Sequence, residues 1–202
     1  DTGVGKTFVT AALLRSYRRD GWQPLGLKPV ASGDRSDGQQ LGAAAGWPQP
    51  LDAINPVFLP EPLAPLLAAE RAGATVDPAR LLAGLREGAA GFAPVLVEGA
   101  GGWRVPLSNG FWISDLAAAL ELPVLVVASA RLGTVNHTLL TVEAIRRDGA
   151  TVAGVLLNHD QPRADLAAAT NAGLLGRFLE LPLVEIPHGA TVLELPDWLR
   201  AF

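Results

Sequence analysis

Residues 1–7, DTGVGKT, carry the pattern that decides the fold, because Gly-Lys-Thr here leads directly into a helical pattern. Glycines let main-chain N–H groups approach phosphate oxygens, and the start of the following helix adds partial positive charge. Lys6 is expected to reach the β- and γ-phosphates, and Thr7 to offer its hydroxyl to Mg²⁺. The stretch predicts a phosphate-binding loop, with a glycine-rich turn before an ordinary helix as the alternative.

Such a loop normally follows a buried strand and begins with a further glycine, and the printed sequence has neither before Asp1. The chain also contains no methionine. We therefore expect an initiator methionine and a central strand to precede Asp1 in the native protein.

The composition predicts one compact domain over residues 1–202, with 49 % hydrophobic and 18 % charged residues. A net charge of −4 argues against a nucleic-acid or anionic-membrane binder. No apolar run approaches the roughly 20 residues of a membrane span. The absence of cysteine excludes disulfides, thiolate metal sites and cysteine nucleophiles.

Short apolar runs alternate with helical patterns along the chain. Strands are predicted at residues 25–27, 94–97, 123–127, 152–157 and 183–186, and helices at 7–19, after Asp77-Pro78 and over 135–147. This alternation predicts an α/β, P-loop NTPase-type three-layer fold, with a mostly parallel sheet and helices on both faces. Functional groups are expected at the carboxyl ends of the strands. The proline-rich residues 47–65 are predicted to form a long irregular loop.

Two strand ends carry charged side chains. Residues 95–98 deliver Glu98, and the following Gly99, Ala100 and Gly101 allow a ligand to approach, as a second metal contact beside a phosphate loop requires. A solvated glutamate is the alternative. Lys28 ends another strand and leads into a proline-set loop, KPVASG, that is suited to a second anion. An exposed turn with a surface lysine is the alternative there.

Two further segments have less specific patterns. Asp37 follows in a polar loop, as either a further Mg²⁺ ligand or a turn residue. Thr134 or Asn136 either caps a helix or lies at an N-terminus whose N–H groups bind a substrate carboxylate. The histidines lack metal-ligand spacing and are expected to be surface or hydrogen-bonding residues: His137, His159 and His188.

In this order, a set of stretches between residue 1 and about residue 189 resembles the dethiobiotin synthetase family: DTGVGKT, KPVASG, NPVFLPEPLAP, VEGAGGWRVPL, RLGTVNHTLLT, GVLLN and EIP. The resemblance implies a cytoplasmic α/β P-loop homodimer, with its active site at the interface. It implies a ligase that uses ATP, Mg²⁺ and CO₂ or bicarbonate. Such enzymes convert 7,8-diaminopelargonate to dethiobiotin, ADP and phosphate.

The resemblance also implies roles for individual residues. Lys28 matches the catalytic lysine, and Lys6 acts on the phosphates. The matched metal positions are Thr7, Asp37 and Glu98. The nucleotide contacts are Gly3, Val4, Gly5, Lys6, Thr7, Phe8, Asp37, Glu98, Gly99, Ala100 and Gly101, with Asn158, His159, Pro187, His188 and Gly189 at the base. The substrate contacts are Thr2 and Ser32, with Gly133, Thr134 and Asn136 receiving the carboxylate from the other subunit.

Other P-loop classes remain as alternatives. Ligases that amidate cobyrinic acid need a glutaminase domain with a catalytic cysteine, which this chain lacks. Partitioning ATPases, which are nucleotide-switched, carry an early loop lysine where this chain has Asp1, and no membrane-targeting C-terminal helix is recognisable. A non-catalytic relative fits poorly, because the proposed metal ligands and both lysines are present. Residues 189–202 match no motif of the family.

Overall fold

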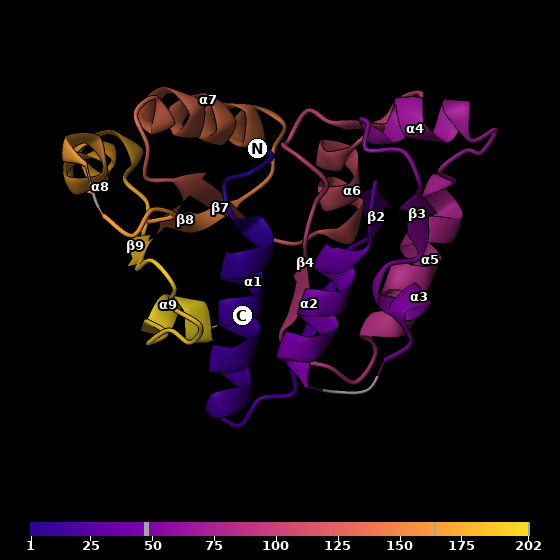
Figure 1. The fold of residues 1–202 in the computed structure, drawn as a ribbon, viewed down its shortest axis with the longest axis horizontal. Helices are drawn as coiled ribbons and strands as arrows, with labels where there is room; N and C mark the ends of the chain where they lie inside the picture. Colours follow the sequence, from indigo (N-terminus) through magenta and orange to yellow (C-terminus); the bar gives the residue numbers. More distant parts are fainter. Residues whose placement is uncertain (47–48, 164, 202) are drawn as a thin grey trace.

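The computed structural model describes residues 1–46, 49–163 and 165–201 (Figure 1). Its parallel strands form three hydrogen-bonded groups: β1 (Leu25–Leu27) with β4 (Val95–Val97), β2 (Val30–Ser32) with β3 (Val57–Leu59), and β7 (Val124–Ser129) with β8 (Val152–Asn158) and β9 (Leu183–Ile186). A short antiparallel pair joins β5 (Pro106–Ser108) to β6 (Phe111–Trp112). Parallel strands predicted from the apolar runs are therefore confirmed.

The pairing register determines which side chains meet at the carboxyl edge. Leu27 of β1 is level with Val97 of β4, so Lys28 and Glu98 follow the ends of adjacent strands. Asn158 at the end of β8 is level with Ile186 of β9. Loops from distant parts of the sequence therefore begin side by side.

Helices connect and cover the strands, and each predicted helix is present. They are α1 (Lys6–Arg19), α2 (Ser36–Ala45), α3 (Leu51–Ile54), α4 (Pro65–Arg71), α5 (Pro78–Ala89), α6 (Ile113–Leu120), α7 (Thr134–Arg147), α8 (Leu166–Leu179) and α9 (Asp197–Arg200). Asp77 caps α5, because its carboxylate accepts hydrogen bonds from the N–H groups of Ala79 and Arg80. Figure 1 shows α7 and α8 beside β7–β9 at one end, and α3, α4 and α5 at the other.

Helix α1 joins two parts of the core. On one side, Leu14 packs with Leu41 of α2 and Ile54 of α3. On the other, Val9 and Tyr17 pack with buried residues of β8, β9 and the C-terminal segment. The helix that begins at the phosphate loop is thus anchored along its length.

The C-terminal segment lies beside α1 (Figure 1), although its sequence matched no motif. Leu193, Leu195 and Leu199 are buried against the helix. The Tyr17 hydroxyl donates to the carbonyl oxygen of Leu199, and Ser16 Oγ accepts a 2.7 Å hydrogen bond from the N–H of Leu193. The segment is therefore part of the core.

Three sequence-based expectations are wrong. Residues 30–32 of KPVASG form β2, because they pair with β3. Residues 49–65 contain α3 and β3 and do not form one irregular loop, and Trp47 and Pro48 lie outside the described residues. Asp37 belongs to the first turn of α2, not to a loop.

In the described part of the chain, no helix is long and apolar enough to span a membrane.

Candidate functional site

The phosphate loop ends in a sharp approach to α1. Gly5 is the N-cap residue with φ 89°, and no side chain caps this helix among the described residues. A Cβ atom at Gly5 would lie 2.2 Å from Asn158 Nδ2, so the position requires glycine for both conformation and space. Lys6 folds back over the loop, with its Nζ 2.6 Å from the Asp1 carbonyl oxygen. The loop thus presents main-chain N–H groups and a lysine to an anion.

Thr7, Asp37 and Glu98, predicted as metal ligands, meet at the start of α1. Thr7 Oγ1 lies 2.8 Å from Asp37 Oδ1 and 2.8 Å from Glu98 Oε1. Three elements position these side chains, namely the first turns of α1 and α2 and the end of β4.

The donor set of this cluster fits Mg²⁺. Glu98 is 4 % exposed, and its Oε2 atom is buried without a hydrogen-bond partner in the described structure. Mg²⁺ prefers oxygen ligands and is often held by one or two carboxylates together with substrate phosphates. Among the described residues, no cluster of three or more His, Asp or Glu side chains is suited to a metal. The cluster itself offers one hydroxyl and two carboxylates.

Lys28 lies between the two carboxylates. Its Nζ is 2.7 Å from Asp37 Oδ2 and 2.7 Å from Glu98 Oε1, and 3.4 Å from the Gly99 carbonyl oxygen. The Lys28 side chain is only 6 % exposed, so this cation is held inside the protein by its partners. Lys6 and Lys28 are the chain's two lysines. Both lie at this site.

Electrostatic surroundings distinguish the two lysines. Burial acts to lower the pKa of Lys28, but the carboxylates of Glu98 and Asp37 outweigh it and raise this pKa. Burial opposes ionisation of Asp37, yet hydrogen bonding to Lys28 keeps the pKa of Asp37 below its usual value. Burial lowers the pKa of Lys6, and the charge of Lys28 lowers it further. Phosphate oxygens would offset this penalty on Lys6.

Some of the residues predicted to contact the substrate lie near this cluster. A Cβ atom at Gly101 would lie 3.5 Å from Thr2 Oγ1, so the loop after β4 adjoins the phosphate loop. Ser32 ends β2, and its hydroxyl is buried without a hydrogen-bond partner in the described structure. The hydrogen-bonding capacity of the Ser32 hydroxyl is therefore unused among the described residues.

Residues predicted to bind the base gather at the ends of β8 and β9. Asn158 is 2 % exposed, and its Nδ2 donates to the Val4 carbonyl oxygen at 3.0 Å. Its Oδ1 has no hydrogen-bond partner in the described structure. The N–H of His159 donates to the Ile186 carbonyl oxygen at 2.9 Å, which places His159 beside the exposed segment Pro187–Gly189. Asn158 thus links the carboxyl end of β8 to the phosphate loop.

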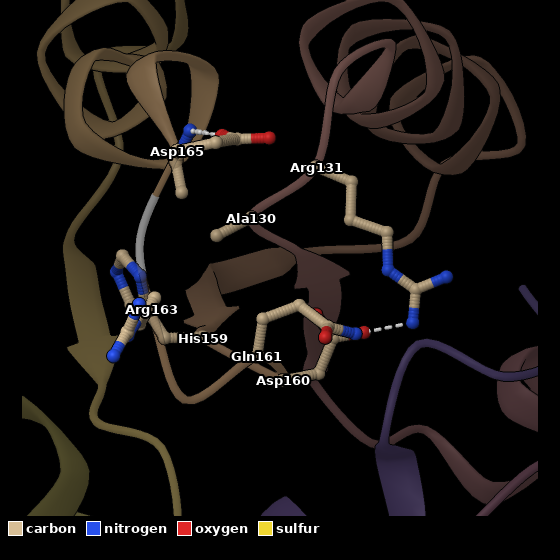
Figure 2. A pocket seen from close by; sticks show the side chains of 8 residues that line it. Ala130, Arg131, His159, Asp160, Gln161, Arg163 and Asp165 are labelled. Carbon is tan, nitrogen blue, oxygen red and sulfur yellow. Dashed lines mark hydrogen bonds and ion pairs between the residues drawn. The ribbon is translucent and has the colours of Figure 1, made fainter.

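A small pocket is lined by residues that follow β7 and β8 and by residues at the start of α8 (Figure 2). Two of the lining residues, Arg131 and Asp160, form an ion pair, and Ser129 Oγ lies 3.1 Å from Asp160 Oδ2. None of the lining residues comes from the phosphate loop: they are Ala130, Arg131, His159, Asp160, Gln161, Arg163, Asp165 and Ala168.

One of the two expectations for the start of α7, that Thr134 or Asn136 caps the helix, is wrong. Gly133 is the N-cap residue with φ 93°, and no side chain makes a capping hydrogen bond there. Thr134 and Asn136 therefore do not cap the helix, because glycine occupies the position from which a side chain would reach back. Thr134 is buried, whereas Asn136 is exposed.

Two residues in contact with the site were not assigned a role from the sequence. Asn55 and Arg35 form hydrogen bonds next to Lys28 and Asp37. Asn55 lies in the NPVFLPEPLAP stretch, but nothing in its spacing indicates that it is buried. Its role depends on contacts between segments that are distant in sequence.

The chain is similar to known proteins over nearly its whole length. The family described as an AAA domain matches residues 1–188. Over 93 % of its length, the chain is 48 % identical to the ATP-dependent dethiobiotin synthetase BioD of Anaeromyxobacter dehalogenans, of which 86 % is covered. It is 45 % identical to the BioD of Aromatoleum aromaticum, over 99 % of this chain and 93 % of that protein. The corresponding protein of Akkermansia muciniphila is 38 % identical, over 96 % and 92 %.

A solved structure shares the fold. The crystal structure of the cell division ATPase MinD of Pyrococcus furiosus matches with a TM-score of 0.53, over 93 % of this chain and 79 % of that one. At 20 % identity, this likeness concerns the fold alone, which is the α/β P-loop NTPase fold. Given 38 to 48 % identity to the three synthetases over nearly its whole length, the chain belongs to the dethiobiotin synthetase family.

Proposed function

We propose that the protein is an ATP-dependent dethiobiotin synthetase, a ligase that carboxylates 7,8-diaminopelargonate and closes the ureido ring. One observation carries the proposal. Lys28, Asp37, Glu98 and Thr7 converge within hydrogen-bonding distance at the start of the phosphate-loop helix. This arrangement suits transfer of a phosphoryl group, for which positioning and charge neutralisation matter more than covalent chemistry.

The nucleotide would lie along the loop from Gly3 to Phe8. Lys6 would contact the phosphates, and the N–H groups at the start of α1 would donate hydrogen bonds to their oxygens. The loop after β4, from Glu98 to Gly101, would approach the same phosphates. At the base end, Asn158 Oδ1 would accept a hydrogen bond from the adenine amino group, and His159 and Pro187–Gly189 would lie beside the base.

Mg²⁺ would be held by Thr7, Asp37 and Glu98. The support is the unpartnered Oε2 atom of Glu98 and the all-oxygen donor set. When bound, Mg²⁺ supplies positive charge to the phosphate oxygens.

The reaction would proceed in three steps. One amine of the substrate adds to CO₂ and loses a proton, which gives a carbamate. A carbamate oxygen attacks the γ-phosphorus as the bond to ADP breaks, which gives a carbamic–phosphoric anhydride. The second amine attacks the anhydride carbonyl and loses a proton, and phosphate leaves as the ring closes. Lys6 and Lys28 would stabilise the charge of the migrating phosphoryl group.

The diamine would lie between Thr2 and Ser32. Its carboxylate would reach Gly133, Thr134 and Asn136 of a second subunit, so we propose a homodimer with the site at the interface. Leu132 supports this assignment, because it is 88 % exposed directly before Gly133. Leu140, in α7, is 57 % exposed. Leu132→Asp should therefore dissociate the dimer in sedimentation measurements, and a dimer that survives this change would contradict the placement.

The proposed function is tested by incubating the protein with ATP, Mg²⁺, bicarbonate and 7,8-diaminopelargonate. Dethiobiotin is detected by mass spectrometry, and phosphate is measured in the same samples. We expect one phosphate for each dethiobiotin. ATP hydrolysis that does not depend on the diamine, with no ureido product, would instead favour a nucleotide-switched ATPase.

A further inference from the structure

We propose that Asn55 and Arg35 are positioning residues of this site, which fix the positions of Lys28 and Asp37 relative to each other. This inference rests on the proposed function for its catalytic consequence, but its structural basis is independent. Hydrogen bonds from Arg35 and Asn55 join the start of α2 to the backbone of Lys28.

Both main-chain polar groups of Lys28 are bound by one segment. The Lys28 N–H donates to the Ile54 carbonyl oxygen at 2.8 Å. Its carbonyl oxygen accepts from Asn55 Nδ2 at 2.8 Å, and the same amide group donates to the Val57 carbonyl oxygen at 3.0 Å. Asn55 is 1 % exposed. The point from which the Lys28 side chain extends is thereby fixed between β1 and β2.

Arg35 binds Asn55 from the other side. Its Nε donates to Asn55 Oδ1 at 2.9 Å, and its Nη2 donates to the Asn55 carbonyl oxygen at 2.6 Å. The guanidinium also lies 5.8 Å from the centre of the Phe58 ring. Asn55 therefore uses its amide donors toward Lys28 and Val57, and its two oxygens toward Arg35.

The contacts form a closed ring. Arg35 is the N-cap residue of α2, and Asp37 lies in the first turn of that helix. Asp37 contacts Lys28 Nζ at 2.7 Å, Lys28 is held through its backbone by Asn55, and Asn55 is held by Arg35. A displacement of the Arg35 guanidinium would therefore alter the distance between a proposed metal ligand and the proposed catalytic lysine.

The chemistry of this ring is specific to its residue types. A planar guanidinium can donate to two acceptors at a fixed spacing, which a lysine ammonium does not reproduce. Asparagine is both donor and acceptor, whereas an ionised aspartate accepts only and would leave the Lys28 carbonyl oxygen without its donor.

The experiment compares Arg35→Met with a matched control, Asp52→Asn. Asp52 is 87 % exposed at its side chain and pairs with Arg35 Nη1 at 2.7 Å without contacting Asn55 in any described hydrogen bond. Mn²⁺ binding is measured by electron paramagnetic resonance with a non-hydrolysable ATP analogue, and kcat and KM are measured separately. Circular dichroism gives the folded fraction of each variant.

We expect Arg35→Met to weaken Mn²⁺ binding and to lower kcat, each by roughly tenfold, as is typical when a residue that orients a ligand is lost. The KM for ATP should stay near the wild-type value. Asp52→Asn should resemble wild type, because exposed ion pairs contribute little. Arg35→Lys and Asn55→Asp should show the same pattern, and they replace Arg35→Met if that variant does not fold.

Two outcomes separate this inference from the function on which it rests. If Mn²⁺ affinity and kcat of Arg35→Met equal those of Asp52→Asn, after correction for folded fraction, Asn55 and Arg35 do not position the site. If the wild-type protein makes no dethiobiotin but Arg35→Met still weakens Mn²⁺ binding, the positioning role stands and the proposed function fails.

Discussion

Lys28 Nζ lies 2.7 Å from Glu98 Oε1, and the two side chains are 6 % and 2 % exposed. They follow the ends of adjacent parallel strands, so the backbone register brings them together. A buried ion pair is costly to form, and removal of one partner leaves the other charge uncompensated. The pair is therefore expected at a site where both charges are needed.

Lys28→Gln should lower kcat by about 10²- to 10³-fold, because a preorganised charge at the migrating phosphoryl group is lost. ATP should still bind, since the phosphate loop and Lys6 are unchanged. A fluorescent ATP analogue measures binding, and product formation is normalised to folded protein. Arg86→Gln, on α5, is the control. Turnover of Lys28→Gln at the level of this control would remove Lys28 from the mechanism.

The two lysines should differ in reactivity toward an amine reagent. Only a neutral amine reacts, so Lys6, whose pKa is lowered by burial and by Lys28, should be labelled at lower pH than an ordinary lysine. Lys28 should require a higher pH, because Glu98 and Asp37 raise its pKa against the effect of burial. Peptide mass spectrometry identifies the labelled residue at each pH. ATP should protect Lys6, and earlier labelling of Lys28 would contradict the described electrostatics.

Substitution of Asn158 should affect nucleotide choice more than catalysis. Asn158→Ala removes the unpartnered Oδ1 acceptor proposed to bind adenine. The preference for ATP over GTP, measured as the ratio of kcat/KM values, should narrow by about tenfold or more, because a buried polar contact carries discrimination. Gly5→Ala should instead lower binding of both nucleotides, since its Cβ would collide with Asn158. An unchanged preference in Asn158→Ala would place base recognition elsewhere.

A pair of glycine substitutions tests the packing of the C-terminal segment. In Gly154→Ala, the added Cβ would lie 2.7 Å from the Trp198 ring and 2.9 Å from the Pro182 carbonyl oxygen. Overpacking of this kind should destabilise the protein by about 1–3 kcal/mol. Gly173→Ala, in α8, has no neighbour within 4 Å and should stabilise by about 0.5–1 kcal/mol. Urea unfolding measures both, and equal stability of the two variants would contradict this packing.

The parts of the fold that the sequence predicts are those with a local signal. Continuous apolar runs predict β1, β4, β7, β8 and β9, and parallel pairing then brings Lys28 and Glu98 to one edge. The Gly-Lys-Thr pattern similarly predicts the start of α1. These signals lie within a few residues of the feature that they predict.

The parts that could not be predicted depend on contacts between distant segments. Helix α2 contains Gly38 and Gly42, which weaken its helical propensity. Packing favours glycine at both positions, because a Cβ at Gly42 would lie 2.6 Å from Ile54 Cδ1 and a Cβ at Gly38 would lie 3.1 Å from Asn55 Cβ. The short β2 is recognisable only through its pairing with β3, and the buried Asn55 only through its bonds to Lys28 and Arg35.

The most direct test of the central claim is the fate of isotopically labelled bicarbonate in a reaction with ATP, Mg²⁺ and 7,8-diaminopelargonate. The proposed function predicts that the label appears in the ureido carbonyl of dethiobiotin, and that it is absent when ATP or the diamine is left out. Lys28→Gln should lose this incorporation, whereas Arg86→Gln should retain it. ATP turnover by folded wild-type protein with no label in a ureido product would contradict the account.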